Sequence, residues 1–254
     1  MSLEVCVLLT ALKKTKFERM NLQKIQAAFQ KYKNHVRRQV IQKSKNRLPD
    51  KVLFKWESLK VFQENWDINA TDLAEMYDRS LQNSETKRLW KSTNYEPKRV
   101  MLKFIEMQPD FVRFMFKDLF NEEKEIVGRV DRFVFHCDEL LREYKELNPR
   151  SIENNHYHDD GYQIVSLYLA FRYPESYTLY NFDRFQSLLD ILGVKDIPQS
   201  SDFARFCKVI RTLSKLMSKE DEIFDFHQKR LNPDKHFTGT SLLIVEDFYQ
   251  ALNA

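Results

Sequence analysis

Apolar residues recur at steps of three and four along most of this chain, which is the spacing that places them on one face of a helix. The longest such run extends from roughly Phe17 to Lys45, and no glycine or proline interrupts it before Pro49. Its apolar face is expected to consist of Leu22, Ile25, Phe29, Tyr32, Val36 and Val40. The pattern therefore predicts a long amphipathic helix near the N-terminus.

Further helical runs follow, and they are bounded by capping residues and prolines. Asp50 and Gly193 suit the start and the end of helices, and Pro97 and Pro109 suit first turns. Besides the helices that open at the two prolines, we expect helices over residues 50–66, 73–81, 122–145, 162–173, 182–192, 202–217, 220–229 and 242–252. No strictly alternating run with turn glycines indicates a strand, so the sequence predicts an all-α fold.

Basic residues are concentrated in the first quarter of the chain. Residues 13–60 contain fifteen lysines and arginines against three acids, a net charge of +12, whereas residues 61–254 carry −7. The predicted architecture is a multi-helix bundle with a long basic amphipathic N-terminal helix. We expect a basic helical arm over residues 1–49 and an all-helical body over 50–254, with a sub-boundary in the polar stretch 148–161.

Four basic residues of the first helix are spaced by seven, so they align on one of its faces. They are Lys24, Lys31, Arg38 and Lys45. This stripe has two interpretations: a solvated face of a helix that docks on the body, or a cationic stripe along a nucleic-acid backbone. In the second case the expected phosphate contacts are Lys24, Lys31, Arg37, Arg38, Lys45 and Arg47.

The scarcity of glycine argues against nucleotide chemistry within the chain. Its four glycines are at least 32 positions apart, so neither a P-loop nor a dinucleotide-binding fingerprint can be formed. We expect no catalytic residue, no cofactor and no metal. Three widely separated cysteines indicate free thiols in a reducing compartment. No apolar segment is long enough to span a bilayer, and we predict a cytoplasmic protein with no membrane partner.

Two other clusters have both a structural and a functional interpretation. His156, His158, Asp159 and Asp160 could ligate zinc or iron, or they form a loop whose aspartates cap the helix near Tyr162. An aromatic run could stack nucleic-acid bases or pack in the core. Its members are Tyr168, Phe171, Tyr173, Tyr177, Tyr180, Phe182 and Phe185. We favour the structural interpretation of both clusters.

Three stretches together resemble a known family. They are the string FQENWDINATDLAEMY over residues 62–77, the stretch 89–134 with YEPKRVM and VRFMFKDLF, and NHY at 155–157 leading into SLYLAFRYPESYTLY at 166–180. They resemble the region that precedes the ATPase module in McrB-like AAA+ proteins, the relatives of modification-dependent (5-methylcytosine-specific) restriction enzymes. The similarity covers roughly residues 50–250.

This resemblance implies a parent protein with a downstream AAA+ motor, a McrC-like nuclease partner and foreign or modified DNA as the target. The chain ends at Ala254 before any Walker motif, so no family active-site residue is carried over. The first hypothesis is a non-catalytic targeting or regulatory domain of a McrB-like restriction ATPase that contacts DNA through the basic helix. The second is a protein-interaction or oligomerisation module that packs on its own motor or a partner chain. The third is a helical metalloenzyme centred on His156 and His158.

Overall fold

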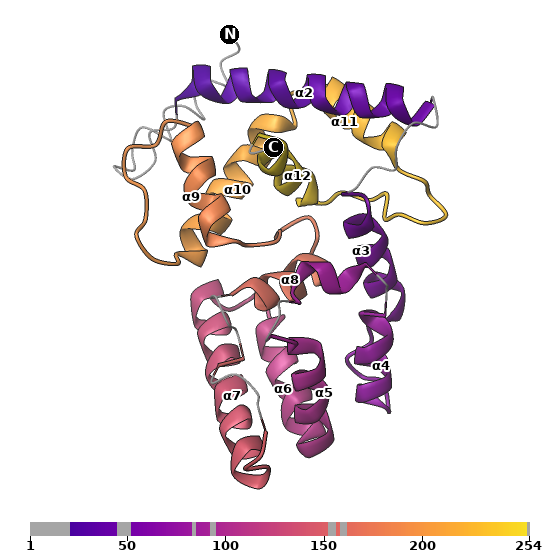
Figure 1. The fold of residues 1–254 in the computed structure, drawn as a ribbon, viewed down its shortest axis with the longest axis vertical. Coiled ribbons are helices and arrows are strands. Elements are labelled where there is room, and N and C mark those ends of the chain that lie inside the picture. The colour runs from indigo at the N-terminus through magenta and orange to yellow at the C-terminus, as the bar shows by residue number, and fades with distance from the viewer. Residues whose placement is uncertain are drawn as a thin grey trace.

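The computed structural model describes residues 21–44, 52–82, 85–91, 95–151, 156–157 and 162–252. Within these ranges the fold is all-α, as predicted, with eleven α-helices, one short 3-10 helix and no strand. Figure 1 shows two groups of helices, one above the other. The lower group comprises α3 (Phe54–Asn65), α4 (Leu73–Ser80), η1 (Thr86–Leu89), α5 (Pro97–Met107), α6 (Pro109–Leu119), α7 (Ile126–Leu147) and α8 (Gln163–Arg172).

The upper group joins the N-terminal helix of the described chain to its last four helices (Figure 1). It comprises α2 (Leu22–Ser44), α9 (Phe182–Ile191), α10 (Phe203–Met217), α11 (Asp221–Arg230) and α12 (Leu243–Leu252). The helix α2 lies across the top of this group, and the chain passes from the lower to the upper group between α8 and α9. The expected division into residues 1–49 and 50–254 stays a prediction, since residues 45–51 lie outside the described ranges.

Most helix ends follow from local chemistry that the sequence shows. The carboxylate of Asp72 accepts from Glu75 N at 2.9 Å and caps α4, and Asp202 caps α10 through Arg205 N at 2.9 Å. Pro97 and Pro109 are the first residues of their helices. After α9, Gly193 takes φ 72°, and its N–H donates to Asp190 O at 2.8 Å. This left-handed turn confirms the expected glycine stop.

Two helices start later than expected. The helix predicted over residues 50–66 is α3, which begins at Phe54 with no side-chain cap at Leu53, and the expected cap Asp50 lies outside the described residues. The run at 122–145 predicts a start at Glu122, but α7 begins at Ile126. The side chain of Asn121 accepts from Glu123 N at 3.0 Å and closes a turn ahead of the helix. Glu122 lies in that turn and pairs instead with the buried Arg129 at 2.6 Å. The acidic residues therefore form the approach to the helix rather than its first turn.

The lower group is held together by an aromatic core. Trp66 meets Phe116 and Phe120 edge to face, with ring centroids 5.1 and 5.6 Å apart. Phe116 also lies across Tyr168 of α8 at 5.1 Å. Edge-to-face pairs of this kind add stabilisation beyond the burial of apolar area. The helix α8 is buried on nearly all sides and lies where the lower group meets the upper group (Figure 1).

The apolar face of α2 is covered by the upper group. Ile25, Phe29, Tyr32 and Val36 are no more than 4% exposed. Phe29 and Tyr32 both meet Phe248 of α12 edge to face, with centroids 5.2 and 5.6 Å apart. The helix is thus docked on helices from the far end of the chain. None of the described helices combines the length and the apolarity that crossing a membrane requires.

Candidate nucleic-acid interface

The helix α2 carries six basic residues and no acidic residue, and its side chains divide around the buried stripe. At about 100° per residue, Lys24, Lys31 and Arg38 lie on one side of that stripe, and Lys33 and Arg37 lie on the other. We call the first set the open flank and the second the paired flank. Of the expected contacts, Arg37 lies on the paired flank, about 100° around the helix from Arg38.

The paired flank faces the acidic start of α11. Lys33 Nζ lies 2.7 Å from a carboxylate oxygen of Glu222 and 3.8 Å from one of Glu220. The hydrogen bond from Lys33 lowers the pKa of Glu222, and the charge of Arg37 adds to this effect. These contacts are surface ion pairs, which contribute little to stability and are screened by salt. They nevertheless neutralise the charge of Lys33 on this flank.

The open flank has no such neutralisation. Lys24, Lys31 and Arg38 are exposed, and none forms an ion pair with a carboxylate in the described ranges. Arg38 Nε donates to Asn34 O at 3.2 Å within its own helix. The stem of Lys24 crosses Gly193, where an added Cβ would come within 2.9 Å of Lys24 Cδ. With a rise of 1.5 Å per residue, the three cations are spaced about 10 Å apart along the helix.

Two of the expected contact residues, Lys45 and Arg47, lie outside the described residues. Their contribution stays a prediction from the sequence.

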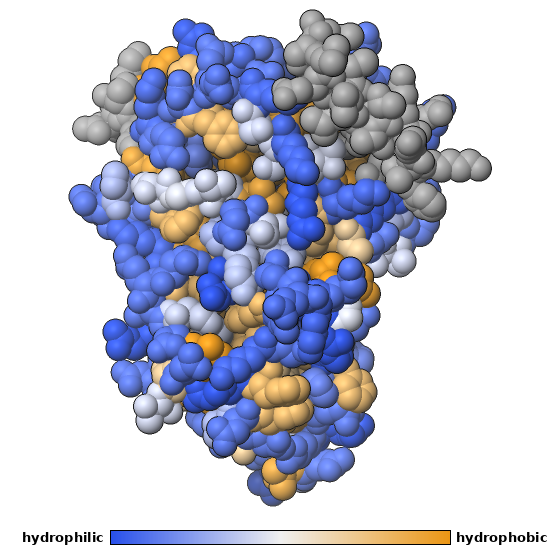
Figure 2. All heavy atoms as spheres, turned by 180° about the vertical axis from the view of Figure 1, so that it is seen from behind, coloured by the Kyte–Doolittle hydropathy of each residue, from blue (hydrophilic) through white to orange (hydrophobic). Residues whose placement is uncertain are grey.

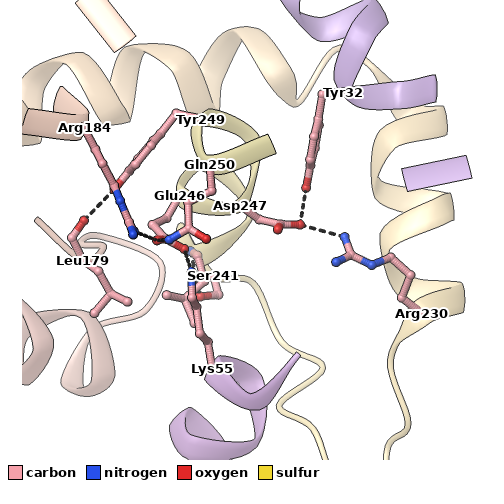
Figure 3. A network of polar contacts seen from close by, with 11 residues as sticks. Tyr32, Lys55, Leu179, Arg184, Arg230, Ser241, Glu246, Asp247, Tyr249 and Gln250 are labelled. Carbon is pink, nitrogen blue, oxygen red and sulfur yellow. Dashed lines mark hydrogen bonds and ion pairs between the residues drawn. The ribbon is translucent and has the colours of Figure 1, made fainter. Parts of the chain in front are cut away.

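A buried charged network behind α2 was not expected from the sequence (Figure 3). On α12, Asp247 accepts from Tyr32 Oη at 2.8 Å and from Arg230 Nη1 at 2.7 Å. The adjacent Glu246 pairs with Lys55 of α3, and both side chains are almost fully buried. The network connects α2, α3, α11 and α12. Its sequence signal is the pair Glu246-Asp247 within the apolar run LLIVEDFYQAL, since charges in a core helix need partners.

The surroundings shift the pKa values of the two acids in this network in opposite directions. Burial raises the pKa of Glu246, although the charge of Lys55 opposes this shift. Burial also acts to raise the pKa of Asp247, but the charge and hydrogen bond of Arg230, with the hydrogen bond from Tyr32, outweigh burial and lower it. Nearby, burial and the charge of Arg230 lower the pKa of His227 to about 4, so this histidine is neutral at pH 7.

The metal cluster that the sequence suggested is not assembled in the described residues. His158, Asp159 and Asp160 lie outside them, and His156 Nδ1 contacts Asp138 Oδ2 at 3.1 Å. No group of three histidine, cysteine or acidic side chains with metal-binding geometry occurs among the described residues. Cys137 and Cys207 are buried free thiols, and burial raises the pKa of Cys207 to about 12. A thiol with this pKa is a poor nucleophile at neutral pH.

The aromatic run packs in the core, as favoured above. Five of its seven members are buried, and Tyr173 and Phe182 are partly buried against the core. Rings in this position cannot stack on bases without unfolding the group. The buried members are Tyr168, Phe171, Tyr177, Tyr180 and Phe185.

Comparisons with known proteins add no further assignment. No family model, curated protein or solved structure matches the chain.

Proposed function

We propose that this chain binds nucleic acid through its phosphates, using the open flank of α2. The observation that carries this proposal is the asymmetry between the two flanks. Lys33 is paired with the acids of α11, whereas Lys24, Lys31 and Arg38 keep their charge available along about 21 Å of helix. A row of cations on a rigid helix neutralises successive phosphates without reading base sequence.

The wider biological setting rests on the resemblance to McrB-like proteins. In that setting the chain is a non-catalytic targeting or regulatory domain, and a downstream AAA+ module and a McrC-like nuclease complete the restriction system. A phosphate-binding helix suits this position, because a targeting domain needs affinity for DNA while the motor and the nuclease perform the chemistry. The proposed target is duplex DNA.

A duplex titration tests the DNA contact. For three phosphate contacts, we expect the logarithm of the binding constant K to fall with the logarithm of the salt concentration with a slope of about −2.7. Replacing Lys31 and Arg38 by glutamine should weaken binding and reduce the slope by about 2. The matched control replaces Arg79 and Lys117, exposed cations of the lower group, by glutamine and should leave binding unchanged. Absence of binding at low salt, or binding that survives the α2 changes, would refute the proposal.

A second candidate function, a protein-interaction or oligomerisation module, has support on a different surface from the one expected. The apolar stripe of α2 is buried within the chain and is not available to a partner. On α6 and α7, however, Phe114 and Phe135 are 56% and 59% exposed. Figure 2 shows a largely hydrophilic face with apolar side chains in patches at several heights, including its lower end. Exposed apolar patches of this kind mark association sites.

Sedimentation velocity tests self-association through this surface. The expected result is a concentration-dependent dimer that Phe114→Ser with Phe135→Ser abolishes while the helical circular dichroism is retained. A chain that stays monomeric at all concentrations would exclude a second copy as the partner.

A further inference from the structure

A cavity of about 300 Å³ lies between the upper and lower groups. It is lined by residues of α3, η1, α8, α9 and α12 and by the segment between α8 and α9. This volume is at the lower end of the range of about 300–1,000 Å³ that small-molecule sites occupy. Clefts between packed groups of helices are common places for such sites, so the charges and walls of this cleft are informative.

Three cations and one carboxylate line the cleft. Lys55, Arg88, Arg184 and Glu246 are all among its lining residues. The buried Lys55 is neutralised by Glu246, and Arg88 pairs with Glu85 at 2.5 Å. Arg184 has only a distant contact, since its Nη1 lies 3.7 Å from Glu246 Oε1. The cleft thus carries an excess positive charge that is located at Arg184.

The donors of Arg184 are not used by the part of the fold that the structure describes. A charge-assisted hydrogen bond has a length of about 2.7–2.9 Å, so the 3.7 Å contact with Glu246 is an electrostatic approach and not a hydrogen bond. The guanidinium donates no side-chain hydrogen bond to any residue that the structure describes, and its side chain is 51% exposed. As Figure 3 shows, it extends from α9 toward Glu246 and Tyr249. A guanidinium with open donors can bind an oxyanion in a bidentate manner.

The remaining wall of the cleft combines apolar and aromatic side chains with the amides of Gln163, Asn181 and Gln250. Phe54 and Tyr249 line it, and the guanidinium of Arg88 lies 4.4 Å from the centroid of the Phe54 ring. The hydroxyl of Tyr249 donates a hydrogen bond to Leu179 O at 2.9 Å, and this bond fixes the ring in place. A flat ring would therefore find aromatic and amide groups beside the cationic rim.

We infer that this cleft binds a small molecule that carries an anionic group on a flat ring. The anion is held by Arg184 with assistance from Arg88, and the ring lies against Phe54 and Tyr249. The buried pair Lys55 and Glu246 forms the floor. This site is separate from the open flank of α2 and does not depend on the proposed DNA contact.

Calorimetric titration with phenyl phosphate tests this assignment, with benzoate to distinguish phosphate from carboxylate. We expect saturable one-to-one binding with at least one of the two probes. Arg184→Gln should weaken it about tenfold or more, the loss expected from hydrogen bonds to a charged group. Arg88→Gln should weaken it less. The matched control is Arg142→Gln, since Arg142 is exposed and pairs with Glu139 three residues away, as Arg88 pairs with Glu85.

Three outcomes would overturn the assignment. They are no saturation by either probe up to about 10 mM, equal weakening by Arg184→Gln and Arg142→Gln, and inorganic phosphate binding as tightly as phenyl phosphate. Circular dichroism verifies that each variant is folded. The Lys31→Gln and Arg38→Gln variant should retain probe binding, and Arg184→Gln should retain duplex binding, so failure of one proposal is distinguishable from failure of the other.

Discussion

Two buried networks, one in the lower group of helices and one in the upper group, pair their polar atoms in different ways. In the lower group, Tyr77, Tyr157 and Tyr168 share a chain of hydroxyls with oxygen–oxygen distances of 2.6 Å. Every member of this chain is neutral, and burial raises the pKa of each hydroxyl. In the upper group, the buried network contains the ion pair of Asp247 and Arg230.

This difference predicts that the two networks tolerate substitution of their buried residues to different degrees. Loss of one neutral hydroxyl leaves a partner that costs little to keep buried, whereas loss of one ion leaves an uncompensated buried charge. The charged network also joins α2 to α11 and α12, so it positions the helix that carries the proposed DNA contact. The neutral network serves only the interior of the lower group.

The largest expected effect is at Arg230. Arg230→Met leaves Asp247 buried without its cation, and we expect the free energy of unfolding to fall by about 3–5 kcal/mol in urea at neutral pH. The double variant with Asp247→Leu should recover most of this loss, because it removes both charges. A loss below about 1 kcal/mol in the single variant would contradict the distinction between the two groups.

Acidification should weaken the upper group through His227. Its pKa in the folded protein is lowered to about 4, so the unfolded chain takes up this proton first as the pH falls. Stability is therefore lost between about pH 6.5 and pH 4, with about 2 kcal/mol lost by pH 5. Urea unfolding at several pH values measures this slope. His227→Gln should reduce it, and an unchanged slope in the variant would assign the effect to other groups.

A smaller effect is expected in the neutral network. Tyr168→Phe removes the central hydroxyl and leaves Tyr77 and Tyr157 with one partner fewer. The free energy of unfolding should fall by about 1–2 kcal/mol and should show little dependence on pH below 8. If the loss equals that of Arg230→Met under the same conditions, charge is not what separates the two groups.

The sequence predicted the helices well because their boundaries depend on local chemistry. Pro97, Pro109 and Gly193 act within one turn of the chain, and the structure places each where the pattern indicated. The late start of α7 is an exception that also has a local cause, since the turn at Asn121 competes with the helix. The apolar stripe of α2 likewise identified the buried residues correctly.

The parts that the sequence did not predict depend on contacts between distant residues. Tyr32 and Asp247 are 215 positions apart, and Lys55 and Glu246 are 191 apart, so no local pattern pairs them. The same limitation applies to the candidate interface. A spacing of seven aligns Lys24, Lys31 and Arg38, but only the docking of α11 shows that Lys33 and Arg37 face acids.

The two flanks of α2 provide the most direct test of the proposed function. Lys31→Gln with Arg38→Gln and Lys33→Gln with Arg37→Gln remove the same charge from the same helix, and duplex binding is then measured over a range of salt. The account predicts that the first pair reduces the slope of log K against log salt by about 2 and that the second pair leaves it nearly unchanged. Equal losses from both pairs, or no loss from either, would contradict the assignment of the open flank as the phosphate-binding surface.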